Sequence, residues 1–408
     1  MRSILTLNAG SSSLKFALFG VEGMCAARLL GGLIESHGSV TTFHVASSAG
    51  ATIANRHLNS GDASFDAGAA LDILLEWLSV TTPNLELAAV GHRVVHGGAI
   101  FSMPVVLEDT VIAKLEQLTS LAPLHQPFNL KSVAAARKAF PNVPQIGCFD
   151  TAFHRGHAFE EAAFGLPRSY YEEGIRRYGF HGLSYDYIVR QMARIAPAVA
   201  DGRIVVAHLG SGASLCAVRE RTSVASTMGF SALDGLLMGT RCGAIDPGVL
   251  LYLMSEKGMD APKLTQLLYR ESGLKGLSGV SSDMRALETS SEPNAAQAIA
   301  CFVARVRREI GAMVATIGGI DALVFTGSIG ENSARIRAAV TTGLDWLGVE
   351  INPEQNEDES YELSAQGSRV RVFRIPTDEE WMIARHAIGL MAAAAADLVP
   401  LNQVRWAA

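Results

Sequence analysis

Two short stretches of this chain repeat one pattern half a chain apart. Residues 4–18, ILTLNAGSSSLKFAL, place alternating apolar residues on both sides of a small-residue turn, which predicts a β-hairpin with a polar tip. Residues 203–218, RIVVAHLGSGASLCAV, repeat the arrangement, and Gly210 follows Gly10 by 200 residues in a chain of 408. This period predicts two copies of one α/β unit facing each other across a cleft, although two matching elements are weak evidence on their own.

Strand and helix patterns alternate along the rest of the chain. Buried strands are predicted at residues 86–97 and 144–150, and the second of these ends on Asp150. This alternation predicts an α/β architecture. Apolar residues recur with helical spacing in five segments, at residues 66–80, 129–139, 184–196, 294–317 and 378–396.

No low-complexity linker separates the two halves of the chain. The position of the second hairpin alone therefore places the boundary near residue 150, with a first domain over residues 1–150 and a second over residues 151–382. The last helix, from about residue 383 to residue 408, is expected to pack back on the first domain.

The composition excludes several classes of protein. Hydrophobic residues make up 49% and charged residues 18%, a balance typical of folded rather than disordered chains. The net charge of -6 offers no general attraction to nucleic acid or to an anionic membrane, and no apolar run approaches a membrane span. The 5 cysteines have no CxxC pair and an odd count. We therefore expect a cytoplasmic protein that binds neither nucleic acid nor membrane.

The two hairpin tips have the chemistry to hold phosphate groups. In the first, small residues run from Asn8 to Ser13, and Lys15 follows. Small residues let backbone N–H groups approach phosphate oxygens, while hydroxyls and a lysine add donors and charge. An ordinary polar turn explains the same residues, but the second tip, HLGSGAS, favours two phosphate-binding loops. Neither tip matches the P-loop pattern.

Two arginines stand where an anion would explain them. Arg93, in GHRVVHGG, interrupts an apolar strand, so a buried salt bridge and an oxyanion clamp are rival interpretations. Arg241, in TRCGAIDP, lies between small-residue turns, and two such arginines suit a transferring phosphoryl group. His181 precedes a predicted helix, and a structural role and an anion contact are the two interpretations of this residue. The histidines have no zinc-type spacing.

Two further turns and a helix start complete the pattern. SGVSSDMR and FTGSIGENS border apolar runs, and the second is typical of a nucleotide-binding turn between a strand and a helix. An ordinary helix cap is the alternative interpretation of residues 331–333. In IPTDEEWMIAR a helix is expected to start at Thr377 or Asp378. Acidic residues in its first turn complement the helix dipole, which explains Glu379 and Glu380 without a metal.

Taken in order, these segments resemble the acetate kinase family, within the acetate and sugar kinase, Hsp70 and actin superfamily. The resemblance implies duplicated ribonuclease H-like domains that face each other across an active-site cleft, and a homodimer. It also implies reversible, Mg²⁺-dependent transfer of the γ-phosphoryl group of ATP to acetate, giving acetyl phosphate and ADP. The matching strings are LNAGSSSLKF, GHRVVHGG, APLHQP, FDTAFH, RRYGFHG, HLGSG, MGTRCGAIDP, SGVSSDMR, IGENS and IPTDEE.

The resemblance assigns roles to the charged residues. It implies that Arg93 binds the substrate carboxylate and that His181 and Arg241 stabilise the transition state. Asp150 fills the position usually given to a catalytic acid or base. A carboxylate substrate is already ionised at pH 7, with a pKa of about 4 to 5, so no proton has to be removed. We therefore expect Asp150 to orient an arginine or the metal shell, and catalysis to rest on alignment and charge neutralisation in a direct in-line transfer.

The resemblance also implies a metal site and a nucleotide site. Asn8 and Glu379 are expected to organise Mg²⁺ through water, with Mn²⁺ as an alternative metal. Contacts to ATP are expected from both hairpin tips and from the two later turns. The residues concerned are Ser11, Ser13, Lys15, His208, Leu209, Gly210, Ser211, Gly212, Asp283, Met284, Arg285, Ser328, Ile329, Gly330, Glu331 and Asn332.

The acyl group is expected to contact a small set of residues. In the family, the position of Ala232 usually holds proline, and the smaller side chain leaves room for one more methylene. One methylene is worth only about 1 to 3 kcal/mol of discrimination, so a propionate or short-chain acyl kinase is the alternative. The residues expected to bind the acyl substrate, together with Arg93, are Val95, Leu124, His125, Phe180 and Ala232.

Other departures from the family pattern concern the phosphoryl donor. Ser211 replaces a usual asparagine and Ser328 a usual glycine, so a pyrophosphate-using acetate kinase is a further alternative. Met284 replaces phenylalanine, and Leu183 and Tyr185 replace threonine and histidine after His181. An actin- or Hsp70-like switch ATPase is the alternative from a different class. Such a protein needs no arginine for a carboxylate.

Overall fold

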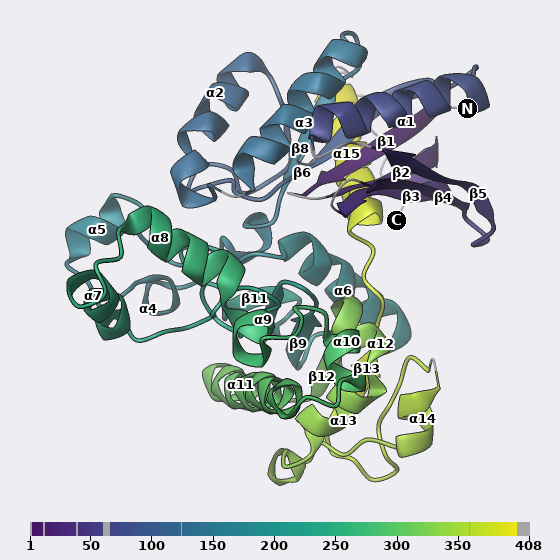
Figure 1. Ribbon diagram of the computed structural model, residues 1–408. Coiled ribbons are helices and arrows are strands. Elements are labelled where there is room, and N and C mark those ends of the chain that lie inside the picture. Colours follow the sequence, from purple (N-terminus) through teal and green to yellow (C-terminus); the bar gives the residue numbers. More distant parts are fainter. Residues whose placement is uncertain are drawn as a thin grey trace. The chain divides into compact units, whose positions relative to one another are not determined.

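The chain divides into two compact units (Figure 1). The computed structural model describes residues 2–10, 13–37, 40–59, 66–123, 125–358 and 360–397. The first unit combines Met1–Ala152 with the chain from Asp378 on, and the second is Phe153–Thr377. No helix among the described residues combines the length and apolar character that a membrane span requires.

A single twisted sheet forms the centre of the first unit. Its described strands follow the order β5-β4-β3-β2-β1-β6-β8-β7. The strands β1 to β5 are antiparallel neighbours, whereas β1, β6 and β8 run parallel. The bounds are β1 Arg2–Ala9, β2 Ser13–Glu22, β3 Cys25–His37, β4 Val40–Ser47, β5 Thr52–Asn59, β6 Glu86–Val94, β7 Val105–Val106 and β8 Gln145–Phe149. The predicted first hairpin and both predicted strands are confirmed.

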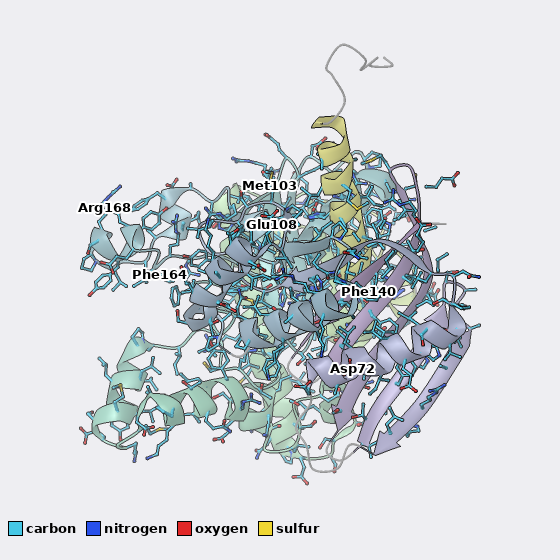
Figure 2. All side chains as sticks on the ribbon, turned by 90° about the horizontal axis from the view of Figure 1, so that it is seen from above. Asp72, Met103, Glu108, Phe140, Phe164 and Arg168 are labelled. Carbon is cyan, nitrogen blue, oxygen red and sulfur yellow. The ribbon has the colours of Figure 1, made fainter. Side chains whose placement is uncertain are left out.

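Helices cover both faces of this sheet. Val90 on β6 packs in a core with Leu71 and Trp77 of α1, on the face that α3 also covers. The next residue, Gly91, meets Ile383 of α15 on the other face, because neighbouring residues of a strand point to opposite sides. Asp72, labelled in Figure 2, lies on the exposed side of α1. The helices are α1 Ala67–Thr81, α2 Asp109–Gln117, α3 Gln126–Ala139 and α15 Glu379–Asp397, with a 3₁₀ turn η1 at Thr119–Leu121.

The second unit is built around a smaller sheet in the order β11-β10-β9-β12-β13. Tyr185 and Ile188 of α6 pack in a core with Val206 of β9 and Val324 of β12, and the long helix α11 also packs against β9, β10 and β11. The strands are β9 Arg203–Leu209, β10 Ala213–Arg219, β11 Thr222–Ser226, β12 Ala322–Thr326 and β13 Arg371–Arg374, and the two central helices are α6 Gly182–Ile195 and α11 Pro293–Ile317.

Shorter helices occupy the connections of the second unit. They are α4 Phe159–Ala162, α5 Arg168–Glu172, α7 Pro247–Ser255, α8 Ala261–Gln266, α9 Gly273–Ser278, α10 Met284–Thr289, α12 Gly327–Asn332, α13 Ala334–Thr341 and α14 Pro353–Glu357. Single turns stand at η2 Ala152–His154, where the units divide, and at η4 Asp345–Leu347, with a π-helical turn η3 at Leu267–Glu271.

The two sheets share one strand topology. In β3-β2-β1-β6-β8 of the first and β11-β10-β9-β12-β13 of the second, two antiparallel pairings are followed by two parallel ones. The two hairpins differ by one residue in their pairing, because Asn8 lies opposite Lys15 on β2, whereas His208 lies opposite Ser214 on β10. The duplication predicted from the repeated hairpin is therefore confirmed in the strand order.

Candidate active site

In the first unit, Arg93 near the end of β6 is held by two side chains. Its Nη2 atom lies 2.5 Å from Asp150 Oδ2, and its Nε donates to the same carboxylate at 3.0 and 3.1 Å. Its Nη1 donates to Asn8 Oδ1 at 3.1 Å. Asp150 is only 1% exposed, and burial raises the pKa of its carboxyl against the opposing effect of the Arg93 charge. The carboxylate thus fixes the plane of the guanidinium.

Asn8 connects this pair to the first turn of α15. Its Nδ2 donates to Glu379 Oε2 at 3.1 Å and to Glu380 Oε1 at 3.2 Å. Burial, followed by the charge of Glu379, raises the pKa of Glu380. Asp378 caps the helix by accepting from the backbone N–H of Trp381 at 2.9 Å, so the expected helix start is confirmed. The contact of Glu380 with Asn8 was not anticipated, because helix polarity alone explained that carboxylate.

The part of the chain described contains no cluster of three or more His, Cys, Asp or Glu side chains able to hold a metal directly. A Mg²⁺ ion that arrives with a nucleotide needs few protein ligands, since phosphate and water oxygens complete its octahedral shell. The hard oxygens of Asn8 and Glu379 suit such indirect binding, and Asn8 Oδ1 is already engaged by Arg93. Asn8 and Glu379 therefore fit a Mg²⁺ ion that is bound through water, as the sequence predicts.

The residues expected around the acyl group are divided between the units. Val95 follows β6 and is buried, and its backbone N–H donates to Asn129 Oδ1 at 2.9 Å. His125 stands at the start of α3 in the same unit, whereas Phe180 and Ala232 belong to the second. Leu124 lies outside the described residues. Asn129, which also donates to the carbonyl of Ala9 at 2.7 Å, was missed because nothing in its helix distinguishes it.

In the second unit, the tip of the β9–β10 hairpin brings His181 and Arg241 together. A Cβ atom placed on Gly212 would lie 3.3 Å from both His181 Nε2 and Arg241 Nη2. His181 begins α6 with a φ of 59°, a strained conformation for a residue other than glycine. Its ring stacks on His208 at 4.2 Å, and Arg241 Nη1 donates to the carbonyl of Ala232 at 2.7 Å. A guanidinium nitrogen and an imidazole nitrogen therefore border one glycine.

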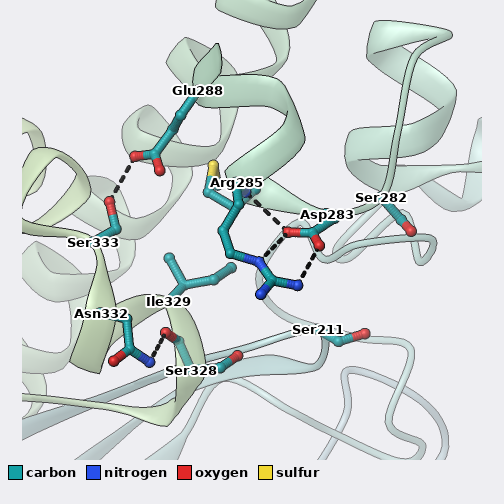
Figure 3. A pocket seen from close by; sticks show the side chains of 10 residues that line it. Ser211, Ser282, Asp283, Arg285, Glu288, Ser328, Ile329, Asn332 and Ser333 are labelled. Atoms are coloured by element: carbon teal, nitrogen blue, oxygen red, sulfur yellow. Dashed lines mark hydrogen bonds and ion pairs between the residues drawn. The ribbon is translucent and has the colours of Figure 1, made fainter. Parts of the chain in front are cut away.

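A pocket of about 480 Å³ lies between α10 and α12 in the same unit (Figure 3). Arg285 pairs with Asp283 at 2.6 Å, Glu288 accepts from Ser333 at 2.6 Å, and Asn332 donates to the carbonyl of Ser328 at 2.9 Å. The pocket is lined by seven of the residues expected to bind the nucleotide, Ser211, Asp283, Met284, Arg285, Ser328, Ile329 and Asn332, and by Ser282, Glu288 and Ser333.

The last three lining residues were missed for different reasons. Ser282 and Ser333 stand inside the two turn motifs, so those motifs were the available signal. Glu288 lies beyond its motif on α10, where no pattern marks it.

Other residues expected to bind the nucleotide do not line this pocket. Glu331 accepts from the backbone N–H groups of Gly327 at 2.8 Å and Thr377 at 3.0 Å, which ties the α12 turn to the end of the unit. His208, Leu209, Gly210 and Gly212 belong to the hairpin, and a Cβ on Gly210 would lie 3.4 Å from Ser328 Oγ. Gly330 is buried within α12. Ser13 and Lys15 lie on β2 in the first unit, and Ser11 falls outside the described residues.

Two mixed sheets with one shared strand order define an α/β fold of the actin-like ATPase type. The model of the acetokinase family matches residues 3–385. The chain belongs to the acetokinase family.

Named relatives and solved structures agree with this assignment. An acetate kinase of Methylocella silvestris is 54% identical over 397 residues, covering 96% of this chain and 98% of the relative. One from Rhodopseudomonas palustris is 51% identical, covering 94% and 97%. The propionate kinase structure from Francisella tularensis matches with a TM-score of 0.86 at 34% identity, covering 95% and 99%. The Porphyromonas gingivalis acetate kinase matches with a TM-score of 0.83 at 36% identity, covering 96% and 100%.

Proposed function

We propose that this protein is an acetate kinase that transfers the γ-phosphoryl group of ATP to acetate, reversibly and by direct in-line displacement. The observation that carries the proposal is the guanidinium of Arg93, held by Asp150 and Asn8 at the end of β6. A planar guanidinium recognises a carboxylate through paired N–H donors. The names of the relatives supply the identity of the substrate class.

In this mechanism Arg93 binds the acetate carboxylate and Asp150 keeps the arginine aligned. The substrate is ionised at pH 7, so its oxygen attacks phosphorus without losing a proton. The short contacts of Asp150 with Arg93 support an orienting role rather than that of a base. Alignment then supplies much of the rate enhancement.

His181 and Arg241 are proposed to stabilise the transferring phosphoryl group. Charge spreads over its three equatorial oxygens in the transition state, and donors aimed at them act there. The support for these roles is that His181 Nε2 and Arg241 Nη2 both border Gly212, at the tip of the hairpin.

Asn8 and Glu379 are proposed to hold Mg²⁺ through water. When bound, the ion neutralises phosphate charge and orients the phosphate chain. The amide oxygen of Asn8 also accepts from Arg93, and its amide nitrogen donates to Glu379. Asn8 therefore connects the proposed acetate-binding arginine to the carboxylates of α15.

The nucleotide is proposed to occupy the pocket beside Ser328 and Asp283. A pocket of about 480 Å³ suits a nucleoside, whereas pyrophosphate would leave it empty. ATP is therefore favoured over pyrophosphate as the donor, and a switch ATPase is disfavoured because it has no use for the Arg93 clamp.

One experiment separates these alternatives. The purified protein is supplied with acetate, propionate or butyrate and with ATP or pyrophosphate, and acyl phosphate is trapped with hydroxylamine. We expect most product from acetate with ATP, and a smaller yield from propionate because Ala232 relaxes the acyl site. Product from pyrophosphate but not from ATP would overturn the donor assignment. ATP hydrolysis at full rate without a carboxylate, unaffected by Arg93→Ala, would indicate a switch ATPase instead.

We further propose that the protein is a cytoplasmic homodimer. The resemblance to the family is the first support. The second is the α7 patch, defined as Val249, Leu251, Tyr252 and Met254, whose exposed fractions are 41%, 67%, 53% and 51%. Helix α7 buries none of its residues, which is unusual for so apolar a helix unless a second surface covers it. All 5 cysteines are free thiols, as a reducing compartment requires.

A further inference from the structure

A row of buried hydroxyls leads from α6 to the ring of His181. Tyr185 lies one helical turn after His181, and its hydroxyl is 2.5 Å from Ser214 Oγ on β10. Ser214 Oγ is in turn 2.9 Å from His181 Nδ1. Tyr185 and Ser214 are both fully buried, with exposed fractions of 0%. The far ring nitrogen of His181, Nε2, borders the hairpin tip at Gly212.

The direction of these hydrogen bonds follows from counting hydrogens. If Tyr185 donates to Ser214, the serine hydroxyl donates to His181 Nδ1, and each hydroxyl hydrogen has an acceptor. If His181 Nδ1 carried the proton instead, one of the two hydroxyl hydrogens would have no acceptor within the described part of the chain. A buried donor without a partner is costly. Burial also raises the pKa of Tyr185 well above its usual value, so the phenol keeps its proton.

We propose that Tyr185 is a positioning residue that acts through Ser214 to fix the tautomer of His181, so that its Nε2–H faces the transferring phosphoryl group. In neutral imidazole one nitrogen donates and the other accepts, so an accepting Nδ1 leaves the proton on Nε2. His208 holds the plane of the ring, because it stacks on His181 at 4.2 Å and is itself fixed by Ser184 at 2.9 Å. This inference rests on the role proposed for His181.

The test combines a spectroscopic readout with kinetics. The protein is labelled with ¹⁵N-histidine, and the His181 ring signals are assigned by their loss in His181→Gln. The wild type is expected to show a protonated Nε2 and an unprotonated Nδ1. Tyr185→Phe is expected to give a mixture of tautomers and a roughly tenfold lower kcat, with KM values for acetate and ATP within about twofold. Tyr185→His, which restores an N–H donor, should recover part of kcat.

Two more variants keep the result decisive. Ser214→Ala removes the middle hydroxyl and should change the tautomer in the same way, even if Tyr185→Phe folds poorly. Tyr170→Phe removes an exposed phenol in the same unit and should change neither readout. A wild-type His181 with its proton on Nδ1, or a Tyr185→Phe protein with unchanged ring signals, would overturn the proposal. Because the ring signals need no turnover, an inactive wild type would refute the proposed function and leave the tautomer measurement valid.

Discussion

Arg93 and Arg241 carry the same charge but meet different partners, and their variants should differ in kinetics. Asp150 fixes Arg93, which is proposed to bind the acetate carboxylate. Arg93→Ala should therefore mainly raise KM for acetate, by about 10- to 100-fold. Arg241 borders Gly212 beside His181, so Arg241→Ala should mainly lower kcat, by about 10²- to 10³-fold. Steady-state kinetics with both substrates varied will measure this. Arg168→Ala, at an exposed arginine, is the control, and the reverse pattern would exchange the two roles.

The sequence could suggest these residues but not their pairing. Arg93 was open between a salt bridge and an oxyanion clamp, and the structure shows the salt bridge to Asp150. The clamp remains a proposal, and in this structure Nη1 of Arg93 donates to Asn8 Oδ1. The link from Tyr185 through Ser214 to His181 could not be predicted, since it depends on the register of β10 against β9 and on one turn of α6.

At the scale of elements, Gly91 controls how closely α15 approaches β6. A Cβ on this residue would lie 2.5 Å from Ile383 Cγ2, and Ile383 is fully buried. Gly91→Ala should therefore destabilise the protein by about 1 to 3 kcal/mol, because the helix must shift or the side chain must leave its rotamer. Thermal unfolding followed by circular dichroism measures the effect.

The matched control is Gly389, which lies on α15 like Ile383. No atom is found within 4 Å of a Cβ on Gly389, so Gly389→Ala should leave stability unchanged or raise it by up to about 1 kcal/mol. Ile383→Leu, which removes the clashing methyl, should recover part of the loss in a double variant with Gly91→Ala. Equal melting temperatures for Gly91→Ala and the wild type would show that α15 does not pack tightly on β6.

Elements with a strong period could be predicted, and elements defined by their neighbours could not. The five helical segments and the two hairpins follow local patterns of apolar residues, and all of them are present. Strand β5, TIANRHLN, has polar residues on both faces because it stands at the sheet edge, and β7 has only 2 residues. Their pairing partners, rather than their own sequences, make them strands.

For the whole molecule, three histidines with lowered pKa values contribute to the response of stability to acid. Burial lowers the pKa of His92 to about 4, that of His154 to about 3 and that of His157 to about 4, from 6.5. In the unfolded chain they bind protons near pH 6.5, so their contribution is fully present above that pH and is lost as the pH falls toward 4. Proton binding by each of these histidines in the unfolded chain should lower the free energy of unfolding by roughly 2 kcal/mol as the pH falls from 7 to 5.

Urea unfolding at a series of pH values measures this loss. His92 Nε2 donates to Gln145 Oε1 at 2.8 Å, and His92→Gln removes its titration while keeping a polar partner. The variant should take up about one proton fewer on unfolding between pH 5 and pH 6, whatever its absolute stability. An unchanged slope would mean that His92 is protonated in the folded state. Burial raises the pKa of Glu380 and so acts in the opposite direction, which is why the comparison uses slopes.

The exposed apolar surface of α7 leads to a prediction about assembly. The α7 patch exposes four apolar side chains on a helix that buries none of its own residues. If a second copy covers this patch, Leu251→Glu places a charge in an apolar interface and should raise the dimer dissociation constant by at least about 100-fold. Analytical ultracentrifugation of the wild type and the variant measures this.

The control for this substitution is Val80→Glu on α1, at a side chain that is 76% exposed in the first unit. It adds the same charge to an exposed apolar position outside the α7 patch, so the dimer should persist. A monomeric wild type would refute the homodimer, and a dimer that survives Leu251→Glu would place the interface elsewhere. Retained circular dichroism and melting temperature in the Leu251→Glu monomer would show that the helix folds without a partner, because the apolar side chains of α7 contribute to assembly rather than to the core of the second unit.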